Sequence, residues 1–264
     1  MGRIITVANQ KGGVGKTTTA VNLAAALAGM RHRVLLIDLD PQGNATMGCG
    51  IDKHALEASS LEVLLGEVPI REALRPSAEE QFMVLPANSD LTAAEVSLMN
   101  APLREKRLSL AIEPVREAFD YIVIDCPPSL NMLTVNALVA ADGVLVPIQT
   151  EYYALEGLSA LLETVRQIRA HRNPRLDIEG ILRTMHDPRN NLANEVSSQL
   201  ITHFGDKVFR TIIPRNVRVA EAPSFGLPVL LYDRNSRGAI SYMALASEMS
   251  RRHQPRSPTP APVH

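Results

Sequence analysis

The stretch Asn9-Gln10-Lys11-Gly12-Gly13-Val14-Gly15-Lys16-Thr17-Thr18 decides the fold of this 264-residue chain. It follows the apolar run Ile4–Ala8 and precedes a helical pattern of small and apolar residues that extends to Ala28. Glycines let successive backbone N–H groups turn toward one point, and the amino end of a following helix adds a positive dipole there. A strand, a glycine loop and a helix in this order predict a loop that binds the phosphates of a nucleoside triphosphate.

Two side chains of this loop have roles that follow from their chemistry. Lys16 places a point charge on the terminal phosphates, and the Thr17 hydroxyl is a ligand suited to Mg²⁺. The loop is a variant, because Gln10 stands where the strict phosphate-loop pattern has glycine. A Gly-x-Gly-x-x-Gly pattern does not fit the glycines of the loop, which excludes a Rossmann nicotinamide site.

Short apolar runs bounded by turn residues recur along the chain and predict buried strands. The six runs are Ile4–Ala8, Val34–Ile37, Tyr121–Ile124, Val144–Ile148, Ile178–Leu182 and Val208–Ile213. Helical patterns lie between several of them, most clearly from about Leu155 to His171. This alternation predicts an α/β fold, a mostly parallel twisted sheet with helices on both faces. In such sheets ligands bind beyond the carboxyl ends of the strands.

The chain has no internal repeat and no Gly/Ser linker within the first 250 residues, so we expect a single domain, built around the phosphate loop, over residues 1–252. Residues 52–100 have weak periodicity and are interpreted as helices and loops inserted along the sheet edge. Residues 253–264 are expected to be a disordered proline-rich tail, because four prolines remove amide donors and block a helix.

Composition narrows the class of protein further. Hydrophobic residues make up 45% and charged residues 21%, which excludes disorder for the bulk of the chain. Two cysteines, Cys49 and Cys126, are too few for a disulfide framework, and no run is apolar for long enough to span a membrane. With no signal-peptide pattern, these features favour a cytoplasmic setting.

Charge is unevenly distributed along the chain. The net charge is −1, yet residues 1–165 carry 12 basic and 20 acidic side chains, whereas residues 166–264 carry 15 and 8. The basic second part is a hint of contact with an anionic partner. Aromatic residues make up only 4%, with no tryptophan, so any nucleic-acid partner would be contacted through its phosphates rather than by base stacking.

Acidic residues follow two of the predicted strands at the point where each ends. Asp38 and Asp40 come after the second run, and Asp125 after the third. Asp125 is the expected contributor to the Mg²⁺ shell, and Asp40 is expected to orient or deprotonate the attacking water. An alternative is that Asp38 and Asp40 only cap the turn at Pro41.

Together these residues resemble the ParA/Soj partitioning ATPases, which belong to the deviant phosphate-loop class that also includes MinD-like proteins. The resemblance spans about residues 2–252. It rests on Lys11–Thr18, Asp38–Asn44, Asp125–Ser129, Pro214–Arg218 and Glu221–Ser224. It implies Mg²⁺-dependent ATP hydrolysis.

The resemblance also implies roles for individual residues. Lys11 reaches across an ATP-bound sandwich homodimer to the partner's phosphates, which makes Lys11, Lys16 and Asp40 the catalytic set. Asp40 lies in switch I and Asp125 in switch II. The residues expected to hold nucleotide are Lys11, Gly12, Gly13, Val14, Gly15, Lys16, Thr17, Thr18, Pro214 and Asn216, and those expected to hold the metal are Thr17, Asp40 and Asp125.

Partners follow from the same resemblance. The ATP dimer binds double-stranded DNA without sequence preference through Arg189 and Arg218, which places the protein on the nucleoid. A ParB-type centromere-binding protein stimulates slow hydrolysis, and hydrolysis releases the dimer from DNA.

Three other functions share the nucleotide core. A MinD-like membrane-associated positioning ATPase requires a C-terminal amphipathic helix, which Pro255–Pro262 cannot form. An iron–sulfur carrier requires cysteines in a bridging pattern, and Cys49 and Cys126 form no Cys-x-x-Cys. A non-enzymatic adaptor would bind nucleotide without hydrolysing it, and phosphate release distinguishes it.

Overall fold

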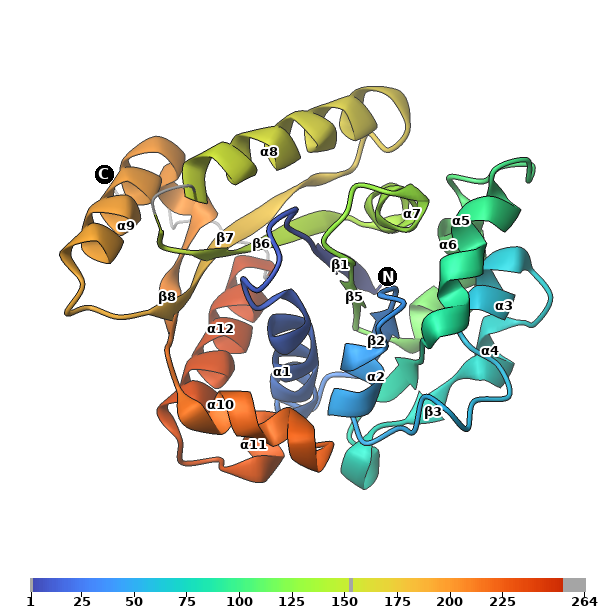
Figure 1. Ribbon diagram of the computed structural model, residues 1–264, viewed down its shortest axis with the longest axis horizontal. Helices are drawn as coiled ribbons and strands as arrows, with labels where there is room; N and C mark the ends of the chain where they lie inside the picture. The colour runs from blue at the N-terminus through green and yellow to red at the C-terminus, as the bar shows by residue number, and fades with distance from the viewer. Residues whose placement is uncertain (1, 152–153, 254–264) are drawn as a thin grey trace, which may run out of the picture.

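The computed structural model describes residues 2–151 and 154–253, and its centre is an eight-stranded sheet (Figure 1). The strand order is β3-β4-β2-β5-β1-β6-β7-β8, and neighbouring strands pair in parallel except β3 with β4. The strands are β1 (Arg3–Val7), β2 (Val34–Asp38), β3 (Arg75–Pro76), β4 (Met83–Leu85), β5 (Tyr121–Asp125), β6 (Gly143–Gln149), β7 (Asp177–His186) and β8 (Val208–Pro214). The predicted fold class is confirmed.

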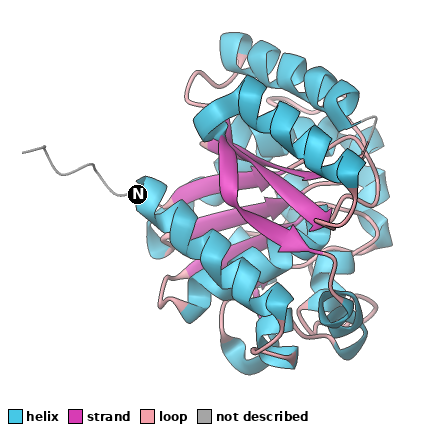
Figure 2. Cartoon of the chain, turned by 90° about the vertical axis from the view of Figure 1, so that its left-hand side faces the viewer, coloured by secondary structure: helices cyan, strands magenta, loops and turns pink. Residues whose placement is uncertain are grey.

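Helices cover both faces of the sheet, as Figure 2 shows. One face is covered by α1 (Lys16–Gly29), α2 (Asn44–Gly48), α10 (Val217–Glu221), α11 (Val229–Tyr232) and α12 (Arg237–His253). The other is covered by α3 (Ser60–Leu65), α4 (Ile70–Ala73), α5 (Ala93–Leu98), α6 (Arg107–Ile112), α7 (Met132–Ala140), α8 (Ala154–His171) and α9 (Asn191–Phe204).

Alternation along the central strands divides the core into two layers. In β2, Leu35 and Ile37 pack into one layer, whereas Val34 and Leu36 pack into the other. Successive side chains of a strand point to opposite faces, so a strand covered on both sides is apolar throughout. That is why the central strands were visible in the sequence as continuous apolar runs.

All six predicted strands are present, and the predicted helix at Leu155–His171 is α8. The interpretation of residues 52–100 as helices and loops alone was wrong, because this segment contains β3 and β4. β4 pairs with β2 and extends the parallel sheet. A strand of three residues carries too little periodicity to be distinguished from a loop.

The end of the described chain is helical. α12 runs to His253, the first residue assigned to the tail from the sequence, and the His253 ring lies 2.7 Å from the Glu179 carboxylate. Residues 254–264 lie outside the described residues. Within residues 2–151 and 154–253, no helix has both the length and the apolar character needed to cross a bilayer.

Candidate nucleotide site

Strand order brings three functional segments to one edge of the sheet. β5 lies between β2 and β1, with Asp125 opposite Asp38 on one side and opposite Val7 on the other. The loop after β1 and the acidic ends of β2 and β5 therefore meet at the carboxyl edge, where ligands bind in open α/β sheets.

The loop after β1 ends at an uncapped helix. Gly15 is the N-cap of α1 with a left-handed backbone (φ 86°), no side chain caps the helix, and its first turn contains no acidic residue. Gly13 is also left-handed (φ 74°). These conformations favour glycine, and the free amides at the amino end of α1 form an anion site of the size of a phosphate chain.

Lys16 is buried at this helix end. Its ammonium donates to the Lys11 carbonyl over 3.0 Å, which holds it beneath the loop. Burial lowers the pKa of Lys16, and the nearby carboxylates of Asp125 and Asp40 oppose that shift. A buried ammonium with a single carbonyl acceptor is well placed to accept phosphate oxygens.

Two polar side chains, one at the start of the loop and one on β7, fix the loop. Asn9 accepts from the Lys11 N–H (3.0 Å) and donates to the Pro147 carbonyl (2.8 Å), and Thr184 donates to the Val14 carbonyl (2.8 Å). The sequence analysis assigned no role to Asn9 or Thr184. The sequence signal that could have identified them is their position next to the ends of predicted strands, where ligands bind.

Lys11 is paired with a residue beyond β6. Its ammonium lies 2.7 Å from the Glu151 carboxylate, and the two side chains are 39% and 50% exposed. Glu151 was also missed from the sequence, although it is an acidic residue just past the strand β6. An exposed pair of this kind is weak, about 0 to 1 kcal/mol, so Lys11 is free to exchange partners.

The two aspartates after β2 have different surroundings. Asp38 is fully buried and accepts hydrogen bonds from Asp40 N–H, Thr46 N–H and the Thr46 hydroxyl. Burial raises the pKa of Asp38 to about 6, and these hydrogen bonds oppose the shift. Asp38 thus fixes the segment from Asp40 to Thr46, whereas the hydrogen bond that spans the turn at Pro41 is made by Asp40, which accepts from the Gln42 N–H.

Asp40 keeps free hydrogen-bonding capacity. Its Oδ1 accepts from the Gln42 N–H (3.0 Å), while Oδ2 has no hydrogen bond among the residues that the structure describes. The side chain is 8% exposed, beside the phosphate loop. This carboxylate can accept a proton or a hydrogen bond from a water molecule.

Asp125 is a buried carboxyl group with neither oxygen hydrogen-bonded within the described part of the chain. Burial raises its pKa well above the ordinary value and Asp38 adds to the effect, while the nearby Thr17 hydroxyl and Lys16 act in the opposite direction. A buried, unpartnered carboxylate beside a phosphate site fits a divalent cation. No cluster of three or more His, Cys, Asp or Glu side chains among the described residues is arranged to hold a metal, so phosphate oxygens would complete the shell.

The other predicted residues follow β7 and β8, further along the same edge. Pro214 ends β8, and Asn216 caps α10 by accepting from the Val219 N–H (3.1 Å). Arg189 lies in the loop after β7, and Arg218 lies in α10 after β8. The two arginines thus follow neighbouring strands of the sheet. Contact of Pro214 and Asn216 with adenine stays a prediction.

Comparison with known proteins identifies the family. A family model described as an AAA domain matches residues 2–178. The chromosome partitioning protein ParA of Myxococcus xanthus is 53% identical over 258 residues, which cover 98% of this chain and 91% of that protein. This chain belongs to the ParA/Soj family of partitioning ATPases. The sporulation initiation inhibitor protein Soj of Bacillus subtilis is 52% identical over 250 residues, 95% of this chain and 99% of that protein.

A solved structure of similar sequence shares the fold over nearly the whole chain. Cobyrinic acid a,c-diamide synthase from Mycobacterium smegmatis, with bound ADP and magnesium, is 38% identical and has a TM-score of 0.85. The match covers 99% of this chain and 100% of that one.

Both cysteines are free thiols in the described structure, and they pack into different core layers. Cys126 lies in the layer beneath α7, and Cys49 lies in the layer beneath α1. Two buried thiols on opposite faces of a sheet cannot ligate one surface cluster, which argues against the iron–sulfur alternative.

Proposed function

We propose that this chain is a DNA-partitioning ATPase that binds ATP with Mg²⁺, dimerises around it, and hydrolyses it slowly. The observation that carries the proposal is the arrangement of two lysines in one loop: Lys16 is buried at the start of α1, whereas Lys11 is 39% exposed and, among the described residues, its ammonium is held only by the exposed Glu151. Kinship with ParA of Myxococcus xanthus and Soj of Bacillus subtilis supports the partitioning role.

In this mechanism the free amides at the start of α1 and the Lys16 ammonium hold the triphosphate. Thr17 and Asp125 would hold Mg²⁺, which supplies positive charge to the phosphate oxygens when bound. Asp40 orients the attacking water through its free Oδ2 and accepts its proton. Lys11 from the partner subunit stabilises the charge that develops on the transferred phosphoryl group.

The contact between Lys11 and Glu151 must break when Lys11 turns to the partner's phosphates. Glu151→Gln is therefore expected to lower the ATP concentration that gives half-maximal dimer by about two- to fivefold, the equivalent of a weak exposed ion pair. Light scattering across an ATP titration measures this. A midpoint that rises in the variant would show that Glu151 supports the dimer instead.

Arg189 and Arg218 are the proposed contacts to DNA. Arg189 is 88% exposed and paired with Asp187, and Arg218 is 52% exposed and paired with Glu221. Such surface pairs exchange readily for phosphate, and the arginines' planar forks suit phosphate oxygens.

Replacing either arginine by alanine is expected to weaken binding to every DNA sequence alike and to reduce the slope of log affinity against log salt by about 1. Fluorescence anisotropy with two unrelated duplexes and ATP present measures both quantities. Arg166→Ala, which removes an exposed arginine of α8 paired with Glu163, is the control. A slope unchanged from wild type would remove the backbone-contact role.

A ParB-type centromere-binding protein is the proposed stimulator of hydrolysis, and the nucleoid in the cytoplasm is the proposed location. The competing MinD-like function predicts ATP-dependent co-sedimentation with liposomes. Our proposal predicts co-sedimentation with DNA and none with liposomes.

Size-exclusion chromatography tests the proposal as a whole. The wild type with Mg²⁺ and ATP is expected to elute as a dimer that co-elutes with duplex DNA, and with ADP as a monomer that does not. A monomer under both conditions would contradict the proposed dimer. A dimer that never carries DNA would contradict the proposed partitioning mechanism.

A further inference from the structure

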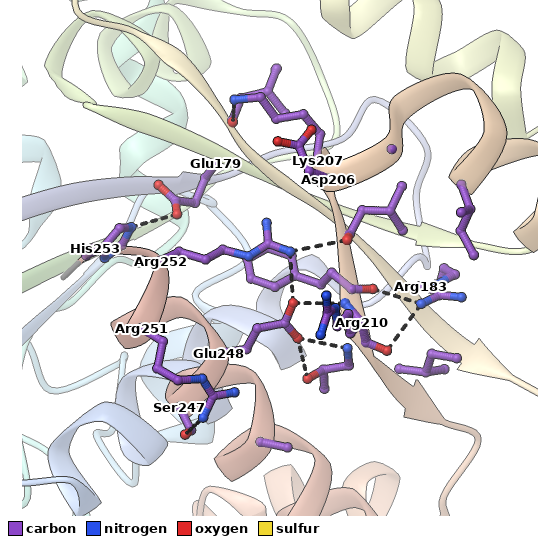
Figure 3. A pocket seen from close by; sticks show the side chains of 18 of the residues that line it. Glu179, Arg183, Asp206, Lys207, Arg210, Ser247, Glu248, Arg251, Arg252 and His253 are labelled. Atoms are coloured by element: carbon purple, nitrogen blue, oxygen red, sulfur yellow. Dashed lines mark hydrogen bonds and ion pairs between the residues drawn. The ribbon is translucent and has the colours of Figure 1, made fainter. Parts of the chain in front are cut away.

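A large cleft lies at the amino end of the sheet, opposite to the nucleotide site (Figure 3). Its walls are the starts of β7 and β8, the turn η4 (Gly205–Lys207), the end of α9 and the last turns of α12. The volume is about 1300 Å³. This exceeds the roughly 300–1,000 Å³ of common small-molecule pockets and suits a segment of another chain.

Three arginines of this cleft lack a carboxylate partner among the described residues. Arg183 is 5% exposed, and its guanidinium reaches only the Ser197 hydroxyl and the carbonyls of Phe209 and Arg210, with Nε unpartnered. Arg210 and Arg251 are exposed and form no ion pair in the part of the chain described.

The acidic residues of the cleft are nearly all engaged. Asp177 pairs with Lys207, Glu179 with Arg3 and His253, and Glu248 with Arg252. Among the described lining residues, Asp206 is the carboxylate left without an ion pair. The cleft therefore has an excess of positive charge, which a ligand of negative charge would balance.

The chain following α12 does not supply that charge through its side chains, because residues 254–264 contain no Asp or Glu. Apart from Asp206, the described lining residues offer no free carboxylate, so the cleft favours an anionic ligand.

Addition of a strand to the exposed edge of β8 is blocked. Glu248 accepts from the N–H groups of Arg210 and Thr211, and Arg252 and Arg183 donate to the carbonyls of this strand (Figure 3). With these main-chain groups already bonded, a ligand in the cleft is held by side chains.

The other residues that line the cleft favour a peptide ligand over a nucleic acid. Two aromatic rings line the cleft. Phe209 is fully buried with the Arg252 guanidinium 4.0 Å above its centroid, and the His253 ring is 15% exposed, bonded to Glu179 and packed against Tyr121, so the cleft offers little ring surface on which a base could stack. Aliphatic surface is available instead at Ile201, which is 48% exposed, and at Ala244. Exposed arginine forks beside aliphatic surface suit carboxylates alternating with aliphatic side chains.

We propose that this cleft is a docking site for an acidic, leucine-rich peptide segment of a protein partner. Arg210 and Arg251 hold its carboxylates, and Ile201 and Ala244 contact its aliphatic side chains. The cleft lies at the end of the sheet opposite the phosphate loop, so docking is expected to be the same with ADP and with ATP.

Fluorescence anisotropy with a labelled 14-residue peptide of alternating Glu-Glu and Leu-Leu pairs tests this on the full-length protein. We expect saturable binding in either nucleotide, about tenfold weaker in the double variant Arg210→Ala/Arg251→Ala, because two charge-assisted hydrogen-bonding groups are lost. The double variant Arg234→Ala/Arg237→Ala removes the same charge at the other end of α12 and is expected to bind as the wild type does.

Three outcomes would overturn the proposal. The first is that a peptide with Gln in place of Glu binds as tightly as the acidic peptide. The second is that both double variants lose the same affinity for the peptide. The third is that duplex DNA displaces the peptide and itself binds more weakly to Arg210→Ala/Arg251→Ala. ATP hydrolysis unchanged in both double variants confirms that the variants are folded.

Discussion

Lys11→Ala is expected to bind ATP as a monomer and to lose both dimerisation and turnover. The Lys11 ammonium lies on the surface against Glu151, and the ammonium that lies beneath the phosphate loop belongs to Lys16. Removing Lys11 should therefore leave the nucleotide affinity of the monomer within about threefold of wild type, since the lost ion pair is weak. Turnover should fall about 100- to 1,000-fold, the usual effect of losing a preorganised charge at a transferring group.

Three measurements separate the properties of this variant. Calorimetry gives the affinity for ATP, light scattering gives the mass and hence the dimer, and phosphate release gives the turnover. Lys106→Ala, an exposed lysine at the start of α6, is the matched control and should resemble wild type. Wild-type hydrolysis in Lys11→Ala would remove the role of Lys11 across the dimer. Loss of ATP binding by the monomer would place Lys11 in its own chain's site.

Asp40→Ala is expected to form an ATP dimer that persists, because this variant should bind nucleotide but hydrolyse it at least about 100-fold more slowly. The physical reason is that Oδ2 of Asp40 accepts no hydrogen bond from any described residue, so this oxygen can orient the attacking water in the wild type. Neighbouring Asp38 is committed to three hydrogen bonds with Asp40 and Thr46, so its role is structural.

A comparison with Asp38→Ala separates the two roles. Asp38→Ala should lower the melting temperature, since three buried donors lose their acceptor, whereas Asp40→Ala, which leaves only the Gln42 N–H without its acceptor, should lower it less. Single-turnover phosphate release together with the lifetime of the dimer on a sizing column measures the catalytic effect. Rapid hydrolysis in Asp40→Ala would show that another group orients the water.

The sequence was sufficient to predict the central sheet because its strands are buried on both faces. Such strands are continuous apolar runs, and the loops after β1, β2 and β5 carried residues whose chemistry pointed to phosphate and Mg²⁺. β3 and β4 were missed because two or three residues at a sheet edge leave no periodic signal.

The groups that support the site were harder to predict. Thr184 and Glu151 contact the phosphate loop from the ends of β7 and β6, far away in the sequence. Asp38 and Asp40 have different roles because Thr46 of α2 donates two hydrogen bonds to Asp38 and none to Asp40. Likewise, the unpaired arginines of the cleft come from β7, β8 and α12, and only the fold shows that they line one cleft.

The central claim is that the loop between β1 and α1 holds the triphosphate of ATP in the presence of Mg²⁺. Isothermal titration calorimetry of ATP into the purified wild-type protein, with Lys16→Ala as the control, tests it most directly. The account predicts saturable uptake of one ATP per chain by the wild type and at least about tenfold weaker uptake by Lys16→Ala, which loses a charged partner of the phosphates. No uptake by the wild type, or equal uptake by both proteins, would contradict it.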